Sequence, residues 1–187
     1  MLQNIVIMED HIMDPDDAGK LEKESRYRSV SKEEILEHIE TGDTVADIGS
    51  GTGFFTDDMA QVAEKVYAID FQEKMHEYYK SKGLPENVQT VTSKASELDI
   101  ENVDVIVSLF SLHEIDIEKS IGRFEQILKP GGKLVIFDWS SEGSGYQGPP
   151  LEKRLNAEKA HQEVSKELKV LEATERKETF KLVGLKK

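Results

Sequence analysis

The chain contains no cysteine among its 187 residues. Disulfide bonds, zinc sites made of thiolates and cysteine nucleophiles are therefore excluded. A protein without cysteine is compatible with a reducing compartment, so we expect it to be cytoplasmic.

Long hydrophobic runs and an excess of positive charge are also missing. One short apolar run, residues 5–8, is followed at once by acidic residues and lacks the basic flank of a signal peptide. No segment approaches the roughly 20 apolar residues of a membrane-spanning helix. The 24 basic residues face 37 acidic ones, which gives a formal net charge of -13. Because such a charge repels phosphate backbones, a nucleic-acid substrate is disfavoured, although the charge can also serve solubility alone.

Length and composition favour a single globular domain over residues 1–187. Residues 1–30, which are polar from residue 9 on, are interpreted as an N-terminal arm or lid, and residues 31–187 as the core. Ser31 and Glu34 form a capping box that predicts the first helix of this core.

Strand and helix patterns alternate along the core. Helical spacing or caps predict helices over 54–63 and 72–81, from Asp116 to the Pro130–Gly132 turn, and from Asn156 onward. Short apolar runs predict strands at 44–48, 66–69, 88–91, 103–107 and 134–137, with two more in 169–186 that meet near Arg176. This alternation predicts an α/β fold with a doubly wound, mostly parallel sheet.

The most informative stretch is a glycine loop, Asp47-Ile48-Gly49-Ser50-Gly51-Thr52-Gly53, between a strand and a helix. Alternating glycines let a backbone turn sharply beside a ligand, and a helix N-terminus adds free N–H groups. A dinucleotide site needs glycine where this chain has Phe54, and the Asp47 carboxylate would repel a pyrophosphate. A carboxylate suits a cofactor that carries an ammonium group.

This loop resembles the D-x-G-x-G-x-G loop of the class I, Rossmann-like, S-adenosylmethionine-dependent methyltransferases. The resemblance extends from about Arg26 to the C-terminus through Ser108–Glu114, Leu128–Leu134 and Phe180–Gly184, and it is strongest to the small-molecule branch related to ubiquinone and menaquinone methyltransferases. It implies a seven-stranded sheet of order 3-2-1-4-5-7-6, with strand 7 antiparallel, in a three-layer α/β/α sandwich. It also implies S-adenosylmethionine as the cofactor and S-adenosylhomocysteine as the product.

Asp70 ends the second predicted strand, 21 residues after Gly49, where an acid can accept both ribose hydroxyls of a nucleoside. Alternatively, Asp70 caps the next helix. Lys94 stands where the family often has an aspartate for adenine, so the backbone of Ala95 or the hydroxyl of Ser96 is expected to read the base. The predicted cofactor-binding residues are Asp47, Gly49, Ser50, Gly51, Thr52, Gly53, Asp70, Phe71, Ala95, Ser96, Ser108, Leu109 and Phe110.

His113, just past the fourth strand, is the predicted catalytic residue, a general base for acceptors that must lose a proton. The competing interpretation is that His113 orders the start of the following helix. The other histidines show no metal-ligand spacing, so no metal site is expected. Arg26 and Tyr27 are candidates for the cofactor carboxylate. An apolar lid, or ordinary packing, is expected from Met8, Met13, Tyr27, Trp139 and Tyr146.

These features predict methyl transfer to a small-molecule acceptor by direct displacement. The lack of cysteine excludes C5-methylation of pyrimidines, which needs a thiolate, and thiol-dependent arsenite methylation. A non-catalytic module that binds the cofactor and, more remotely, a nicotinamide oxidoreductase are the alternatives. The acceptor, the atom methylated and the choice between monomer and homodimer stay open at this point.

Overall fold

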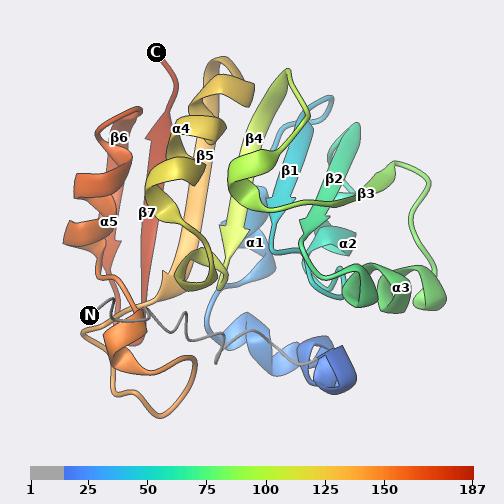
Figure 1. The fold of residues 1–187 in the computed structure, drawn as a ribbon, viewed down its shortest axis with the longest axis horizontal. Coiled ribbons are helices and arrows are strands. Elements are labelled where there is room, and N and C mark those ends of the chain that lie inside the picture. The colour runs from blue at the N-terminus through green and yellow to red at the C-terminus, as the bar shows by residue number, and fades with distance from the viewer. Residues whose placement is uncertain (1–14) are drawn as a thin grey trace, which may run out of the picture.

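The computed structural model describes residues 15–187, in which a twisted sheet lies between two layers of helices (Figure 1). The strands are β1 (Thr44–Ile48), β2 (Lys65–Asp70), β3 (Val88–Thr92), β4 (Val103–Leu109), β5 (Leu128–Trp139), β6 (Lys169–Glu175) and β7 (Thr179–Leu185). The α-helices are α1 (Lys32–Leu36), α2 (Thr56–Met59), α3 (Glu73–Lys82), α4 (Ile117–Ile127) and α5 (Ala157–Val164). Short 3-10 helices cover η1 (Pro15–Glu22), η2 (Glu24–Arg28), η3 (Ala95–Glu97), η4 (Leu112–Glu114) and η5 (Leu151–Lys153).

The sheet confirms the predicted topology. Its seven strands follow the order β3-β2-β1-β4-β5-β7-β6. The pairs among β1 to β5 are parallel, whereas β7 runs antiparallel to both β5 and β6. The order reverses between β1 and β4, and such a switch point leaves a crevice at the carboxyl ends of parallel strands.

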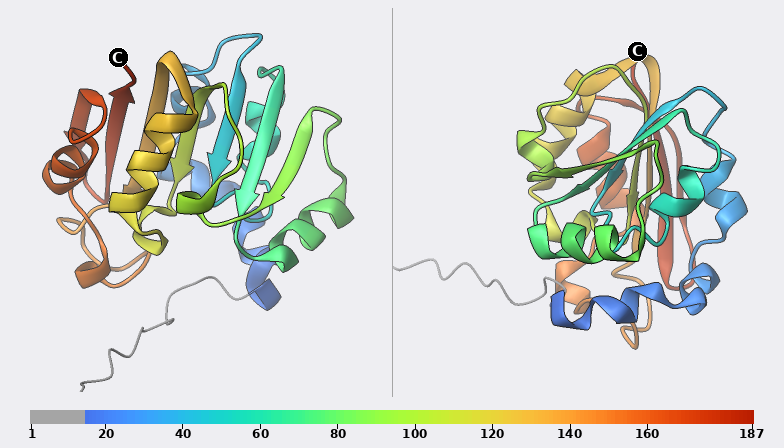
Figure 2. Two further views of the ribbon diagram at one scale, coloured as in Figure 1. Left: turned by 45° about the horizontal axis from the view of Figure 1, so that its top comes forward. Right: turned by 90° about the vertical axis from the view of Figure 1, so that its right-hand side faces the viewer.

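Alternating side chains on the central strands build two cores. On β5, Leu134 and Ile136 belong to one buried cluster, while Val135 and Phe137 belong to the other. Successive side chains of a strand point to opposite faces, so a continuous apolar run indicates burial on both sides. Figure 2 shows the two helical layers that provide this burial. The first cluster takes Ile121 and Phe124 from α4 and Val164 from α5, and the second takes Ile35, Met59 and Tyr79 from α1, α2 and α3.

Three predicted helix starts are confirmed by their caps. Ser31 accepts the N–H of Glu34, whose carboxylate in turn accepts the N–H of Ser31. The side chains of Asp116 and Asn156 each accept an N–H from the third residue of α4 and α5, respectively. Local side-chain chemistry therefore sets where these helices begin.

Two helices are shorter than predicted. The helix expected over 54–63 is regular only at Thr56–Met59, and Asn87 Nδ2 binds the carbonyls of Ala60 and Ala63 just beyond it. The helix expected to reach Pro130 ends at Ile127, because Leu128 is already extended and pairs with Val103 in the sheet. Tertiary partners thus end both helices before the local pattern does.

Candidate functional site

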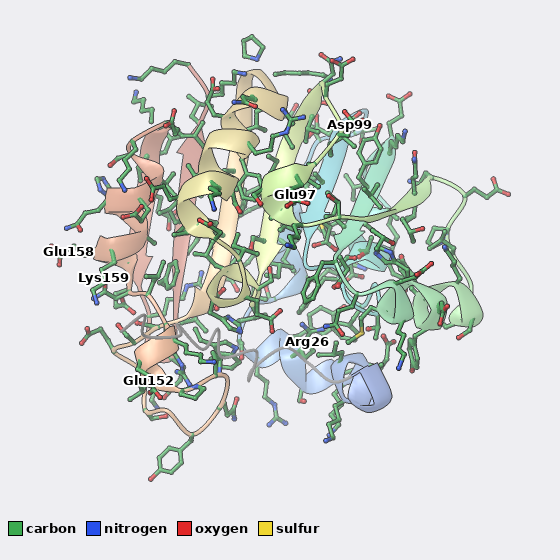
Figure 3. The ribbon with its side chains drawn as sticks, viewed as in Figure 1. Arg26, Glu97, Asp99, Glu152, Glu158 and Lys159 are labelled. Atoms are coloured by element: carbon green, nitrogen blue, oxygen red, sulfur yellow. The ribbon has the colours of Figure 1, made fainter. Side chains whose placement is uncertain are left out.

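A cavity of about 580 Å³ lies at the switch point of the sheet. Its walls come from the residues that follow β1, β2, β4 and β5, from η1 and η2, and from the loop after β5. Figure 3 shows Arg26 of η2 beneath the carboxyl ends of the central strands. The lining residues are Leu21, Ser25, Arg26, Ser29, Gly49, Gly51, Asp70, Gln72, Met75, Leu109, Phe110, Ser111, His113, Glu114, Trp139, Gln147, Gly148 and Pro149.

The glycine loop owes its glycines to protein neighbours as well as to the cavity. Gly49, Gly51 and Gly53 all have positive φ angles. A Cβ atom on Gly49 would lie 2.4 Å from Cβ of Ser111, and one on Gly53 would lie 2.2 Å from the ring of Tyr79. The sequence interpretation credited these glycines to close approach of a ligand, but at two of them the close neighbour is a side chain of the same protein.

Two hydroxyl groups of the loop have no hydrogen-bond partner in the structure. The side-chain oxygens of Ser50 and Thr52 are buried, although most buried polar groups in proteins are paired. Neither residue is on the cavity wall, although both belong to the loop that contributes Gly49 and Gly51 to it.

Asp70 holds a fixed carboxylate at the end of β2. One carboxylate oxygen accepts the N–H of Gly51 at 3.0 Å and the other accepts the N–H of Gln72 at 2.9 Å. Burial raises the pKa of Asp70, and these backbone N–H groups oppose the rise. The Gln72 bond resembles the predicted helix-capping role, but Asp70 also lines the cavity, so its remaining lone pairs can accept hydroxyls of a ligand.

Asp47 lies beneath the loop rather than on the cavity wall. Its side chain is buried and accepts the hydroxyl of Thr56 at 2.6 Å. Burial raises the pKa of Asp47 to about 7, against the opposing effects of the Thr56 bond and the Arg26 charge. Desolvation outweighs both partners because the carboxylate is fully enclosed.

Arg26 provides a cation at the cavity. Its guanidinium carbon lies 4.4 Å from the ring centre of Phe55, and Nη1 donates to the Leu21 carbonyl at 3.1 Å. Burial lowers its pKa to about 10, which still leaves it charged at neutral pH. Tyr27, its predicted companion, instead donates to Asp58 and is absent from the cavity wall.

Aromatic side chains form the wall on the β4 and β5 side. Phe110 follows β4 and Trp139 is the last residue of β5, and their ring centres are 5.2 Å apart. Phe110 has a φ angle of 59°, which is rare for a bulky residue and holds its ring at the cavity. Behind it, the Ser111 hydroxyl donates to the Ile48 carbonyl at 2.7 Å and contacts Ser108.

His113 lies at the cavity with a carboxylate on either side. Nδ1 is 3.2 Å from an oxygen of Asp138, and Nε2 is 3.7 Å from an oxygen of Glu114. Burial favours neutral His113, but the hydrogen bond and charge of Asp138, with the charge of Glu114, outweigh it and raise the pKa. The helix after His113 is capped by the side chain of Asp116.

Arg154 holds the loop after β5 through hydrogen bonds to its backbone. Its buried guanidinium donates to the carbonyls of Pro149, Ser140 and Gln147. Sequence reasoning missed both Arg154 and Asp138. The position of Asp138 near the end of a predicted strand was an available signal, whereas nothing local distinguishes Arg154.

The cavity wall includes six of the fourteen predicted site residues: Gly49, Gly51, Asp70, Leu109, Phe110 and His113. The others are not on the wall, namely Asp47, Ser50, Thr52, Gly53, Phe71, Ala95, Ser96 and Ser108. Of the predicted lid, Trp139 lines the cavity, whereas Tyr146 is 93% exposed and Tyr27 is packed away. Met8 and Met13 lie outside the described residues.

These residues fit the polar groups of S-adenosylmethionine. Asp70 can accept the two ribose hydroxyls, and Arg26 can pair with a carboxylate. The unpaired hydroxyls of Ser50 and Thr52 supply further polar atoms at the loop. From Pro15 to Lys187, no His, Asp and Glu side chains are grouped to hold a metal ion, and no helix is long and apolar enough to span a membrane.

Comparison with known proteins points the same way. Residues 46–136 match a family model described as a methyltransferase domain. Phosphoethanolamine N-methyltransferase 1 of Triticum aestivum is 32% identical over 138 residues, which are 65% of this chain and 27% of that protein. The ubiquinone/menaquinone biosynthesis C-methyltransferase UbiE of Psychromonas ingrahamii is 29% identical over 113 residues, covering 55% of this chain and 45% of UbiE.

A solved structure extends the match to nearly the whole fold. The crystal structure of a SAM-dependent methyltransferase from Aquifex aeolicus has a TM-score of 0.83 and 28% sequence identity, and covers 93% of this chain and 99% of that one. By contrast, the chain spans less than half the length of the two curated relatives. Topology, glycine loop and relatives agree, and together they support a class I S-adenosylmethionine-dependent methyltransferase.

Proposed function

We propose that this protein transfers the methyl group of S-adenosylmethionine to a small-molecule acceptor. The observation that carries the proposal is the convergence of the glycine loop, the Asp70 carboxylate and His113 on one cavity. The first two suit the cofactor, and the third is a titratable group at the same surface. A site that both binds the donor and offers an acid–base group is suited to methyl transfer.

A small acceptor is supported by the size of the cavity and by the charge of the protein. Its volume of about 580 Å³ lies within the usual range of small-molecule sites, and it must hold the cofactor as well. Residues of η1, η2 and the 147–149 loop cover it. The net charge of -13 disfavours nucleic acid. The names of the two curated relatives, a phosphoethanolamine N-methyltransferase and a ubiquinone/menaquinone biosynthesis C-methyltransferase, also refer to small molecules.

We assign the cofactor's contacts as follows. Asp70 accepts the ribose hydroxyls, and Arg26 pairs with the carboxylate of the methionine part. The Gly49–Gly53 loop, with Asp47 beneath it, faces the ammonium group. Leu109 and Phe110 pack against the methionine part, and the 95–96 segment beyond β3 reads adenine.

When bound, S-adenosylmethionine supplies an electrophilic methyl carbon attached to a sulfonium. The protein's contribution is to orient the acceptor and to keep water out. Phe110 and Trp139 provide an apolar wall for this purpose, and Arg154 holds the opposite loop closed from behind.

Calorimetric titration with S-adenosylmethionine and S-adenosylhomocysteine tests the proposal. The Asp70→Ala variant is expected to lose most of the binding, whereas Asp99→Ala, an exposed aspartate far from Arg26 in Figure 3, is expected to retain it. No binding by the folded wild-type protein would refute the proposed cofactor. Tight binding without methyl transfer to any member of a phenol, alcohol and amine panel would favour a non-catalytic binding module.

A further inference from the structure

Asp138 lies near the end of β5 with its carboxylate held from three sides. Oδ2 accepts the N–H of Leu112 at 2.6 Å, and Oδ1 accepts the N–H of Trp139 at 2.6 Å. Oδ1 also lies 3.2 Å from Nδ1 of His113. The carboxylate is 2% exposed and does not line the cavity itself, so it acts on a ligand only through a neighbour.

These bonds determine how His113 carries its proton. A carboxylate can only accept, so Nδ1 of His113 must donate to it, and the lone pair of the neutral ring is then on Nε2. The His113 side chain is only 8% exposed, and the residue lines the cavity. The ring is therefore oriented with its basic nitrogen away from Asp138.

The charged groups that face His113 come from three elements. Asp138 of β5 and Glu114 of η4 raise its pKa, although burial opposes them, and the cation of Arg154, which follows η5, lowers it to a lesser degree. The two carboxylates stabilise the imidazolium that forms when His113 takes a proton. This arrangement of a base and an orienting carboxylate is the one used by serine hydrolases to activate a hydroxyl.

We propose that Asp138 is a positioning residue that presents Nε2 of His113 as the general base, and that the acceptor is a protic group such as a hydroxyl or a protonated amine. This inference rests on the proposed function. The acceptor atom forms a bond to the methyl carbon while the carbon–sulfur bond breaks and leaves a neutral thioether. The acceptor's proton passes to Nε2 of His113 and then to solvent, so charge is conserved.

The variant Asp138→Asn keeps the size of the side chain but changes the hydrogen bond that orients the His113 ring. Two carboxylate oxygens receive N–H groups from Leu112, Trp139 and His113, but an amide has one oxygen. Its NH2 group must therefore take the place of Oδ2 and face the N–H of Leu112, or take the place of Oδ1 and face Trp139 and His113. In the second orientation the amide donates to Nδ1, which moves the ring proton to Nε2 and removes the base. Glu114→Gln is the matched control because it removes the other carboxylate and leaves the Nδ1 bond intact.

Nitrogen-15 NMR of the histidine rings tests the positioning without any acceptor. The His113 signal is identified among the five histidines by its loss in His113→Gln. In the wild-type protein bound to S-adenosylhomocysteine, neutral His113 is expected to carry its proton on Nδ1. Asp138→Asn is expected to lower its pKa and populate the Nε2–H form, whereas Glu114→Gln should keep the Nδ1–H form. A wild-type ring protonated mainly on Nε2 would overturn the proposal even if Asp138→Asn fails to fold.

Methyl transfer to phenol, alcohol and amine acceptors tests the catalytic consequence. His113→Gln and Asp138→Asn are expected to lower kcat by about 100-fold or more with little change in KM for S-adenosylmethionine. The wild-type rate should rise with pH as His113 loses its proton, and His113→Gln should lose this dependence. An unchanged kcat in His113→Gln, or transfer only to acceptors without a dissociable proton such as thioethers, would overturn the inference. Retained calorimetric binding in both variants separates that failure from failure of the cofactor assignment.

Discussion

The buried carboxylate of Asp47 leads to a stability prediction whose size depends on pH. Asp47 is 3% exposed at the end of β1, and burial raises its pKa from 3.8 to about 7. Between these two values the native state keeps a proton that the unfolded chain has lost. Because the unfolded state binds fewer protons there, the stability of the cofactor-free protein falls as pH rises, and the loss is complete above about pH 7.

The magnitude follows from this pKa. Each unit is worth about 1.4 kcal/mol, so raising the pH from 5 through the native pKa of about 7 costs the wild-type protein about 3 kcal/mol. Asp47→Asn cannot ionise, and its side-chain oxygen can still accept the Thr56 hydroxyl. The variant is therefore expected to gain about 3 kcal/mol relative to wild type between pH 5 and pH 8.

Urea unfolding followed by far-UV circular dichroism at both pH values, without cofactor, measures this difference. Asp116→Asn is the control, because Asp116 is an exposed helix cap whose pKa is lowered by Lys119 and asparagine caps equally well. The ionised Asp116 carboxylate stabilises the native state at neutral pH, and this stabilisation declines as the pH falls. The pH dependence is therefore opposite in direction to that of Asp47. A constant difference between wild type and Asp47→Asn across the range would refute the buried, proton-holding state of Asp47.

Three further substitutions each test one local interaction: a steric contact, a set of hydrogen bonds and a helix cap. Gly53→Ala would drive a Cβ into the Tyr79 ring and should lower the free energy of unfolding by about 3 kcal/mol. Gly83→Ala, also at a positive φ angle but in open space, should lower it by only about 1 kcal/mol. Equal losses in urea would contradict the steric explanation. Arg154→Met removes the guanidinium donors from three carbonyls, of which, among the described residues, only that of Ser140 keeps another donor, the N–H of Gly143. It should speed hydrogen exchange over residues 140–150, and unchanged exchange there would show that the guanidinium does not hold the loop. Ser31→Ala removes the capping box and should lower stability by about 1 kcal/mol in calorimetric melting, unless another group caps α1.

Local patterns predicted most elements of the fold. The Thr44–Ile48 strand and the caps at Ser31, Asp116 and Asn156 are as expected, because a short strand and a capping side chain depend on neighbours in sequence. The sheet order came from the family resemblance rather than from any local rule, and it is confirmed. Helix ends were less predictable, since distant partners such as Asn87 compete for the last carbonyls.

The candidate site was predictable where its residues lie at the carboxyl ends of strands. Asp70 is the last residue of β2, whereas Gly49 follows β1, and Phe110 and His113 follow β4. Parallel strands bring such positions to one edge of the sheet. The expected lid was less successful, because the position of Tyr146 in the loop says nothing of whether its ring turns inward.

The sequence by itself determined an α/β chain with a cofactor loop of methyltransferase type, because strand and helix periods and the loop's residue spacing are local properties. Only the tertiary structure decided which groups meet at the cavity. His113 and Asp138 are 25 residues apart, and the parallel pairing of β4 with β5 brings them together. Arg154 likewise reaches the carbonyls of Ser140, Gln147 and Pro149 only through the folding of the loop after β5. Such contacts depend on strand pairing and chain reversal, which arise when the sheet assembles and its apolar faces are buried.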